Sequence, residues 1–460
     1  MQTHMYINTK DLYALYLAHP TVTTDSRRCP EGSIFFALKG ASFDGNAYAL
    51  KALEAGSALA VVDEPEYAID ERFLLVPDVL QALQALAAHH RKAWGKTVLQ
   101  VTGTNGKTTT KELIASVLGK HYNVLYTQGN LNNHIGVPLT LLRLRPEHDM
   151  AVIETGANHP GEIAALCQIV QADCGLITNV GRAHLEGFGS FEGVKRTKGE
   201  LYDDLKRRGK FIFRNAFDDD LRTMAEERDL VLGEKAWPYV EGRVEEMDPF
   251  LRFQWRPDVD APWHTVQTRL VGAYNIANVR AAITVGLHFD VQEKDIDEAL
   301  AEYTPSNGRS EYRETSRHNR LFIDAYNANL TSMQAALTNF QFIRAKRKLA
   351  ILGEMRELGK DSRQAHQEVV RLLTEAGIEA WLVGQEFAQV APADGTMRLF
   401  ANVDEVKETL QKEPVTDCTV LIKGSNSTRL HELPEYGCIM IKCKQFVRKM
   451  RNIERNYGIS

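Results

Sequence analysis

Short apolar runs and amphipathic stretches follow one another along most of the chain. The apolar run Thr97–Val101 leads into the glycine-containing segment Thr102–Thr110, which reads TGTNGKTTT. Beyond it, over Thr108–Lys120, apolar residues recur at the spacing of one helical face. The pattern predicts a strand, a tight glycine turn and a helix, around which the rest of the chain is organised.

Strand-like and helical patterns alternate from about residue 96 to residue 305. The apolar runs Met150–Glu154 and Gly175–Asn179 end in polar residues, and a helical pattern, Gly161–Gln171, lies between them. Such alternation predicts a mostly parallel sheet with helices on both faces. The expected fold class is therefore α/β.

Two further α/β units flank this region. Residues 1–95 contain the strand-like Gly32–Gly40, a helical stretch and the apolar run Ala58–Val62. Residues 306–460 contain strand candidates separated by helical stretches. These candidates are Arg320–Tyr326, Lys348–Met355, Glu379–Gly384 and Thr419–Ser425. A chain of 460 residues has room for about three domains, which we expect at 1–95, 96–305 and 306–460.

Composition and charge narrow the class of protein. Hydrophobic residues make up 44% of the chain, charged residues 25%, and the net charge is −5, which is typical of a soluble globular protein and predicts no nucleic-acid surface. No apolar run approaches the roughly 20 residues that cross a bilayer. The first residues lack the pattern of a secretory signal. We therefore expect a cytoplasmic protein without membrane insertion.

The cysteines are scattered along the chain. They are Cys29, Cys167, Cys174, Cys418, Cys438 and Cys443. No pair has CxxC spacing, and zinc sites need clustered ligands. Reduced, mostly buried thiols are expected rather than a metal site.

The segment TGTNGKTTT carries the residue types that hold phosphate. A glycine turn at a helix start exposes backbone N–H groups to an anion. Lys107 adds a positive charge, and the Thr108 hydroxyl can join the shell of a phosphate-bound Mg²⁺. The implied ligand is a nucleoside triphosphate, although Val101 stands where the standard GxxxxGK[ST] motif has its first glycine. The loop is thus a shorter variant, and an ordinary turn with a capping threonine is the alternative.

Two polar side chains follow predicted strands. Glu154 ends one apolar run and His184 comes after the next. Because ligands of open α/β sheets lie beyond the carboxyl ends of the strands, both are expected on the same rim as Lys107. Glu154 is a candidate Mg²⁺ ligand. His184 would be an unusual one, and a satisfied turn residue is its alternative. The charge-rich segment Lys195–Glu200 is expected to be a solvated helix face, and composition does not show whether one of its lysines has a functional role.

Several motifs, taken in order, resemble the ATP-dependent Mur ligases of peptidoglycan precursor synthesis. They are TGTNGKTTT, ETGAN at Glu154–Asn158, TNVGRAHLEGFGS, TKGEL, GAYNIANVRAAI and NGRS. The resemblance covers essentially the whole chain and implies three domains. An N-terminal domain would bind the UDP part of the substrate, a central domain would use ATP, and a C-terminal Rossmann-like domain would close over the site.

Three segments are similar to one branch of this family, which joins D-Ala-D-Ala to a UDP-MurNAc-tripeptide through an acyl phosphate. They are Asn130–Leu142, Ile323–Leu337 and Ile351–Ser362. The resemblance implies ATP and two Mg²⁺ ions as cofactors, and a monomer is expected. The rivals are a ligase for another amino acid and a nucleotide-binding regulator that has lost ligation. A GTPase switch is disfavoured because no NKxD motif is present.

The resemblance also implies roles for individual residues. The phosphate loop would comprise Gly103, Thr104, Asn105, Gly106, Lys107, Thr108 and Thr109, with Asn275, Asn278, Arg309 and Asp324 on the rest of the nucleotide. Thr108, Glu154, His184 and Lys198 would serve the Mg²⁺ ions, and Lys107, Glu154, His184 and Lys198 would act in catalysis. Lys198 matches the lysine that these ligases carbamylate, a change that turns a cation into a carboxylate-like ligand.

Substrate positions follow from the same resemblance. The motif on the UDP side of the substrate is matched by Asp25, Ser26 and Arg27. The alternative without a function is a capped turn with a surface arginine. Asn327 and Asn329 match positions near the incoming dipeptide. Arg309 matches a hinge arginine, in keeping with the turn composition of its surroundings.

Two departures from the branch's usual pattern stand out. Tyr274 replaces a frequent histidine before Asn275, and Ala325 replaces a frequent serine in the segment DAYN. Tyr274 can still stack on a base, so altered adenine contacts are expected rather than lost binding. Ala325 removes one hydroxyl group.

Overall fold

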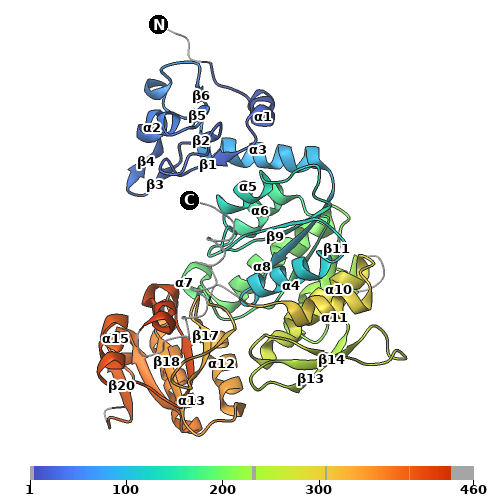
Figure 1. The fold of residues 1–460 in the computed structure, drawn as a ribbon. Helices are drawn as coiled ribbons and strands as arrows, with labels where there is room; N and C mark the ends of the chain where they lie inside the picture. The colour runs from blue at the N-terminus through green and yellow to red at the C-terminus, as the bar shows by residue number, and fades with distance from the viewer. Residues whose placement is uncertain (1–4, 231–234, 306–307, 393, 437–460) are drawn as a thin grey trace, which may run out of the picture. The chain divides into compact units, whose positions relative to one another are not determined.

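The computed structural model describes residues 5–230, 235–305, 308–392 and 394–436. These residues form two compact units. The first contains the described residues of 1–180, 195–239 and 281–292, and the second contains those of 181–194, 240–280 and 293–460. Each unit is described below by itself, with the labels of Figure 1.

The first unit begins with a small parallel sheet of order β1-β2-β5-β6. Its strands are β1 (Val22–Thr23), β2 (Ile34–Phe36), β5 (Leu59–Val62) and β6 (Phe73–Leu75), and its helices are α1 (Thr9–Ala18), α2 (Ala49–Glu54) and α3 (Val79–Trp94). A buried cluster that includes Phe35, Ala52 and Val62 packs the sheet against α2. The single strand predicted at Gly32–Gly40 is divided into β2 (Ile34–Phe36) and β3 (Lys39–Gly40), and β3 forms a two-stranded antiparallel pair with β4 (Phe43–Asp44).

The second sheet of this unit is parallel throughout and has the order β12-β11-β10-β7-β9-β8. Its strands are β7 (Thr97–Thr102), β8 (Val124–Tyr126), β9 (Met150–Glu154), β10 (Cys174–Ile177), β11 (Phe211–Arg214) and β12 (Ala236–Pro238). The associated helices are α4 (Lys107–Leu118), α5 (Gly136–Leu141), α6 (Glu162–Val170), α8 (Phe191–Arg207) and α9 (Asp219–Glu226). The predicted parallel sheet is therefore confirmed in this region.

The register of the central strands sets the position of the site. Val101 pairs with Glu154, and Thr102 pairs with Ile177, so β7, β9 and β10 end at one level. Every residue of β9 and β10 is buried, which explains their continuous apolar runs. The carboxyl ends of these strands form the edge where ligands of open parallel sheets bind.

The second unit contains a six-stranded sheet of order β16-β17-β21-β18-β19-β20. Its strands are β16 (Glu311–Glu314), β17 (Arg320–Asp324), β18 (Lys348–Gly353), β19 (Glu379–Val383), β20 (Met397–Phe400) and β21 (Thr419–Lys423). Only β16 is antiparallel to its neighbour. The helices include α12 (Leu330–Phe342), α13 (Ser362–Ala376) and α15 (Val403–Lys412), and Figure 1 shows them around the sheet.

Alternate residues of this sheet enter two separate cores. Phe322 and Leu352 belong to the core that includes α12 and α13 residues, whereas Leu321 and Ile351 belong to the core that includes α15 residues. Successive strand residues point to opposite faces, so the sheet is covered on both sides. The four strand candidates of this region are confirmed as β17, β18, β19 and β21.

A three-stranded antiparallel sheet in the second unit was not predicted. It comprises β13 (Glu241–Glu246), β14 (Arg252–Arg256) and β15 (His264–Gln267), and α11 (Glu293–Glu302) packs against it. The chain enters it after β12 and leaves it toward α10 (Ile276–His288). β13 reads EGRVEE and is mostly exposed, so it lacks the apolar run of a buried strand.

The described cysteines are free thiols, as expected. Cys167, Cys174 and Cys418 are buried and Cys29 is half-buried. Burial raises the pKa of the Cys167 thiol to about 12. Cys438 and Cys443 lie outside the described residues. Within the described ranges, no group of three or more His, Cys, Asp and Glu side chains is arranged to hold a metal, and no helix has the length and apolarity needed to cross a bilayer.

Candidate active site

The predicted phosphate loop joins the end of β7 to the start of α4. Gly103 has φ +144° and Gly106 has φ +76°, both in the region that favours glycine. A Cβ atom on Gly103 would lie 2.0 Å from Thr178 Oγ1, so a side chain does not fit there. The glycines thus let the loop turn tightly into the N-terminus of α4, where backbone N–H groups can bind an anion.

Residues at the end of β10 hold this loop. Thr178 Oγ1 donates to the carbonyl oxygen of Asn105 at 2.7 Å, and Asn179 Nδ2 donates to the same oxygen at 2.9 Å. The backbone N–H of Asn105 donates to Asn179 Oδ1 at 3.0 Å. Sequence reasoning gave Thr178 and Asn179 no role. Polar residues directly after a buried apolar strand were the available signal.

Lys107 lies over the loop that it was predicted to serve. Its Nζ donates to the carbonyl oxygens of Gly103 at 2.9 Å and Thr104 at 3.0 Å. The ammonium group is therefore held beside the turn, where it can exchange carbonyl oxygens for phosphate oxygens. Thr109 is buried in the first turn of α4, and its role at the nucleotide stays a prediction.

Two buried oxygens beside the loop fit a divalent cation. Thr108 Oγ1 and Glu154 Oε2 have no hydrogen-bond partner among the described residues. Glu154 is only 1% exposed, and its other oxygen, Oε1, accepts a 2.7 Å hydrogen bond from Asn132 Nδ2. Burying an unpaired polar oxygen is costly, so such a pair suits a bound Mg²⁺, whose preferred ligands are oxygens.

Asn132 positions the carboxylate of Glu154 and was not predicted as a site residue. The backbone of Glu154 is fixed as well, because its N–H donates to Thr127 Oγ1 at 2.9 Å. The signals for Asn132 were the asparagine-rich sequence after Gly129 and the resemblance of Asn130–Leu142 to one branch of the family. Its amide leaves the second Glu154 oxygen available for a cation.

Lys198 is buried in the middle of α8, where it lies at helical spacing from the buried residues Val194 and Leu201. It is 2% exposed, and its Nζ lies 3.4 Å from the carbonyl oxygen of Ala157. Burial, together with the positive charge of Lys107, lowers the pKa of Lys198 to about 7. A large share of this side chain is thus a neutral amine near pH 7, which is the form that reacts with carbon dioxide.

The acidic neighbour of Lys198 is engaged elsewhere. Glu200 accepts the backbone N–H groups of Gly161 and Ala164, each at 2.8 Å, at the N-terminus of α6. A carboxylate in that place caps the helix and complements its dipole. The charge-rich segment therefore has one buried lysine and one capping glutamate rather than a uniformly solvated face.

His184 belongs to the second unit, whereas Lys107 and Glu154 belong to the first. Its Nδ1 contacts Glu357 Oε2, and its ring meets the edge of Phe188. These contacts agree with the alternative that His184 is a turn residue whose ring already has partners within the protein. The approach of His184 to the phosphate loop stays a prediction.

The predicted nucleotide residues of the second unit fall into two groups. In the first, Asn275 Nδ2 donates to the Val271 carbonyl oxygen at 2.7 Å, and Asn278 Nδ2 donates to Asn275 Oδ1 at 2.8 Å. The Tyr274 hydroxyl lies 3.4 Å from Ser310 Oγ, and burial raises the pKa of this tyrosine. These amides hold the start of α10, and their contact with adenine stays a prediction.

The second group surrounds the end of β17. Arg309 stacks over the Tyr326 ring with 3.8 Å between the guanidinium carbon and the ring centroid. Asp324 Oδ2 accepts a 2.6 Å bond from Lys423 Nζ, and Lys423 is 1% exposed. Lys423 was not predicted, although a lysine that ends the apolar run TVLI was a usable signal. The structure leaves the nucleotide roles of Arg309 and Asp324 as predictions.

The predicted substrate residues have local structural contacts. Asn329 caps α12, because its Oδ1 accepts the Ser332 N–H at 2.9 Å. Asn327 Oδ1 accepts the N–H of the next residue at 2.8 Å. Arg27 is exposed and forms a two-pronged ion pair with Asp25, at 2.8 and 2.9 Å, while Ser26 between them is half-buried. Their contacts with substrate stay predictions.

Replacing Gly103 with alanine is expected to raise the KM for ATP by at least about 10-fold and to lower stability by about 1–3 kcal/mol, because the clash with Thr178 and the positive φ must both be relieved. Gly209→Ala is the matched control, since Gly209 also has positive φ, at +65°, but has open space around it. Steady-state kinetics and thermal unfolding measure both effects. Equal KM values for the two variants would remove the loop from the ATP site.

Comparisons with known proteins cover nearly the whole chain. Family models match at residues 20–91 (Mur ligase family, catalytic domain), 101–286 (Mur ligase middle domain) and 308–426 (Mur ligase, glutamate ligase domain). The chain is 35% identical over 426 residues to the UDP-N-acetylmuramoyl-tripeptide–D-alanyl-D-alanine ligase of Escherichia coli (strain K12), covering 90% of this chain and 92% of that protein. The chain belongs to the Mur ligase family.

Other relatives of this Mur ligase agree. The enzyme of the same name from Bacillus subtilis (strain 168) is 31% identical over 90% of this chain and 92% of its own. The crystal structure of MurF from Acinetobacter baumannii has a TM-score of 0.80 at 31% identity and covers 90% of this chain and 92% of that one. MurF from Thermotoga maritima in complex with ADP has a TM-score of 0.79 at 25% identity and covers 91% and 97%.

This Mur ligase therefore has the three-domain α/β fold of its family and is a ligase, as the sequence predicted. Each family model lies within one of the three expected segments. The boundaries near residues 95 and 305 stay predictions. Asn307, the first residue of the NGRS motif, and Ser306 before it lie outside the described residues.

Proposed function

We propose that this Mur ligase joins D-Ala-D-Ala to a UDP-MurNAc-tripeptide with conversion of ATP to ADP and phosphate, as a cytoplasmic monomer. The two buried, unpaired oxygens of Thr108 and Glu154 beside the phosphate loop carry the proposal. Its specificity is supported by the relatives with that name, whose similarity covers 90% of this chain. The cytoplasm is the compartment that supplies ATP and nucleotide-linked precursors.

The chemistry requires an activated carboxylate. A carboxylate and an amine do not condense in water at a useful rate, because the leaving group would be hydroxide. Transfer of the γ-phosphoryl group to the terminal carboxylate of the tripeptide creates an acyl phosphate, from which phosphate leaves when the amine attacks. The loop N–H groups and Lys107 would orient the phosphates and take up their charge.

Four side chains would hold the magnesium ions. Thr108 and Glu154 would bind the first ion, and His184 and Lys198 would serve the second, the lysine as its carbamate. Bound Mg²⁺ neutralises phosphate charge during transfer. The neutral amine of Lys198 would add to carbon dioxide and release a proton, and the nearby charge of Lys107 would stabilise the resulting anion.

The remaining predicted residues would bind the two ends of the substrates. Asn275, Asn278, Arg309 and Asp324 would contact the adenosine part of ATP. Asp25, Ser26 and Arg27 would contact the UDP group. For Arg27 this means that its guanidinium leaves Asp25 for a phosphate, whose geometry it fits equally well. Asn327 and Asn329 would lie near the dipeptide.

A coupled assay of ADP release tests the proposal. Wild-type enzyme is expected to release ADP only when both UDP-MurNAc-tripeptide and D-Ala-D-Ala are present, with tripeptides containing meso-diaminopimelate and L-Lys tried in parallel. Replacing the dipeptide with free meso-diaminopimelate, L-Lys or glutamate serves as the control. Turnover with one of these and none with D-Ala-D-Ala would assign a different amide ligase. ADP release without a second substrate would contradict ligation.

A further inference from the structure

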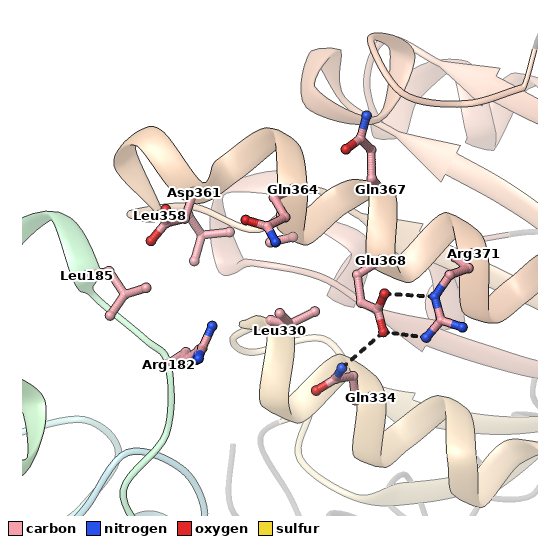
Figure 2. Close-up of a pocket in the computed structure, with 11 residues that line it drawn as sticks. Arg182, Leu185, Leu330, Gln334, Leu358, Asp361, Gln364, Gln367, Glu368 and Arg371 are labelled. Atoms are coloured by element: carbon pink, nitrogen blue, oxygen red, sulfur yellow. Dashed lines mark hydrogen bonds and ion pairs between the residues drawn. The ribbon is translucent and has the colours of Figure 1, made fainter. Parts of the chain in front are cut away.

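The second unit contains a cavity of about 410 Å³. None of the residues given a role in the preceding sections lines it. Its walls come from Arg182 and the start of α7 (Leu185–Phe188), the first turns of α12, and the region from Leu358 into α13. Figure 2 shows these elements facing one another across the cavity. The lining is part apolar and part charged, which suits a small ligand with both characters.

The apolar part of the lining is formed by small and medium side chains. Leu185, Leu330 and Leu358 line the cavity together with Ala365 of α13. Leu358 and Ala365 are buried, whereas Leu185 and Leu330 keep part of their surface exposed. Such a surface accommodates methyl groups rather than a long side chain.

Two opposite charges in the lining have no partner among the described residues. Arg182 is exposed and makes no hydrogen bond or ion pair in these ranges, and Asp361 precedes α13 without capping it by a side-chain hydrogen bond. Figure 2 shows the guanidinium of Arg182 beside Leu330, with Asp361 and Gln364 on the α13 side. The cavity therefore offers one cationic and one anionic group.

The other charges of the lining already satisfy each other. Arg371 donates to both carboxylate oxygens of Glu368 at 2.7 and 2.8 Å, and Gln334 Nε2 lies 3.4 Å from Glu368 Oε1. This network closes one end of the cavity (Figure 2) and leaves no net charge there. Arg182 and Asp361 are thus the charges left for a ligand.

The wall that carries Arg182 is fixed by contacts within the same unit. His184 contacts Glu357, and a Cβ atom on Gly359 would lie 3.5 Å from Glu186 Cβ, so the two segments are packed closely. Gly359 has φ +55°, which lets the chain turn against α7. These contacts hold Arg182 opposite α13.

We propose that this cavity binds the incoming D-Ala-D-Ala as a zwitterion. Its carboxylate pairs with Arg182, its two methyl groups pack on the leucines, and its ammonium group pairs with Asp361 and Gln364 on arrival. A purely anionic ligand would meet the carboxylate of Asp361, and a purely cationic one would meet Arg182. The inference rests on the proposed function and names the residues that select the second substrate.

The test compares D-Ala-D-Ala with D-alanyl-D-alaninamide, which lacks the terminal carboxylate. Wild-type enzyme is expected to show a KM for the amide that is about 10- to 100-fold higher. Arg182→Ala is expected to raise the KM for the dipeptide by a similar factor and to reduce the difference between the two ligands to about 3-fold or less. The KM values for ATP and the UDP-linked tripeptide should not change.

Two further variants sharpen the result. Asp361→Asn is expected to raise the KM for both ligands alike, because both carry the ammonium group. Arg363→Ala is the matched control, since Arg363 is exposed near the start of α13 but does not line the cavity, and it should behave as wild type. Unchanged thermal unfolding temperatures verify that each variant is folded.

The two proposals fail in different ways. If wild-type enzyme ligates D-Ala-D-Ala but Arg182→Ala still discriminates fully against the amide, the cavity inference is wrong and the proposed function stands. If wild-type enzyme does not ligate the dipeptide, the proposed function fails, and calorimetric titration of D-Ala-D-Ala onto wild type and Arg182→Ala tests the cavity without turnover. Equal heats for the two proteins would overturn it.

Discussion

Replacing Lys198 with alanine is expected to lower kcat for ligation by about 100- to 1,000-fold, because the carbamate that would hold the second Mg²⁺ cannot form. Acetate or formate added to the variant should restore part of the activity, since a small carboxylate can enter the space that the side chain leaves. Lys198→Arg keeps a positive charge but cannot be carbamylated, so it should be as inactive and should not respond to carboxylates.

Carbon-13 bicarbonate provides an independent measurement of the same group. Wild-type enzyme should show a carbamate signal by NMR that decreases as the pH falls below about 7, where protonation of Lys198 prevents reaction with carbon dioxide. Lys206→Ala is the matched control, because Lys206 lies on the same helix in an exposed ion pair with Asp229. Full activity in Lys198→Ala would refute the carbamate and the role of this lysine.

Glu154→Gln is expected to lower kcat by about 100- to 1,000-fold through the loss of a Mg²⁺ ligand. Magnesium should strengthen the binding of a non-hydrolysable ATP analogue to wild-type enzyme. In the variant, the increase in analogue affinity that magnesium causes should be about 10- to 100-fold smaller, while the affinity measured without metal should stay the same. Calorimetry with and without Mg²⁺ separates the two contributions.

A control for this variant is available on the loop before the same strand. Glu147 is exposed just before β9, so Glu147→Gln removes the same charge without touching the buried oxygens. It should keep the wild-type response to magnesium. If Glu154→Gln also keeps that response, the unpaired oxygens of Thr108 and Glu154 do not mark a metal site.

Most of the strands that the sequence predicted in the two large sheets are buried along their length, although β11 is also largely buried and was not predicted. Met150–Glu154 and Thr419–Lys423 are continuous apolar runs because helices cover both sides of their sheets. β13 could not be found in this way. Its residues are mostly exposed, so its pairing with β14 depends on a partner strand rather than on its own composition.

The same distinction holds for the candidate site. Lys107 and Thr108 were predicted because a glycine turn between a strand and a helix is a local pattern. Asn132 contacts Glu154, which is 22 positions away, and Asn179 contacts Asn105, which is 74 positions away. Such contacts exist only after folding. The burial of Lys198 was missed because its segment is rich in charge, although its spacing from Val194 and Leu201 places it on the apolar face of the helix.

The hydrogen bonds from Lys107 to the carbonyl oxygens of Gly103 and Thr104 have a consequence for nucleotide affinity. The chain itself holds the ammonium group of Lys107 at the turn, through these two carbonyl oxygens. Each arriving nucleotide must displace these contacts, which weakens net affinity and makes departure of the spent nucleotide easier. Because Lys107 already has hydrogen-bond partners within the chain, the loop favours fast release of ADP over tight binding of the nucleotide.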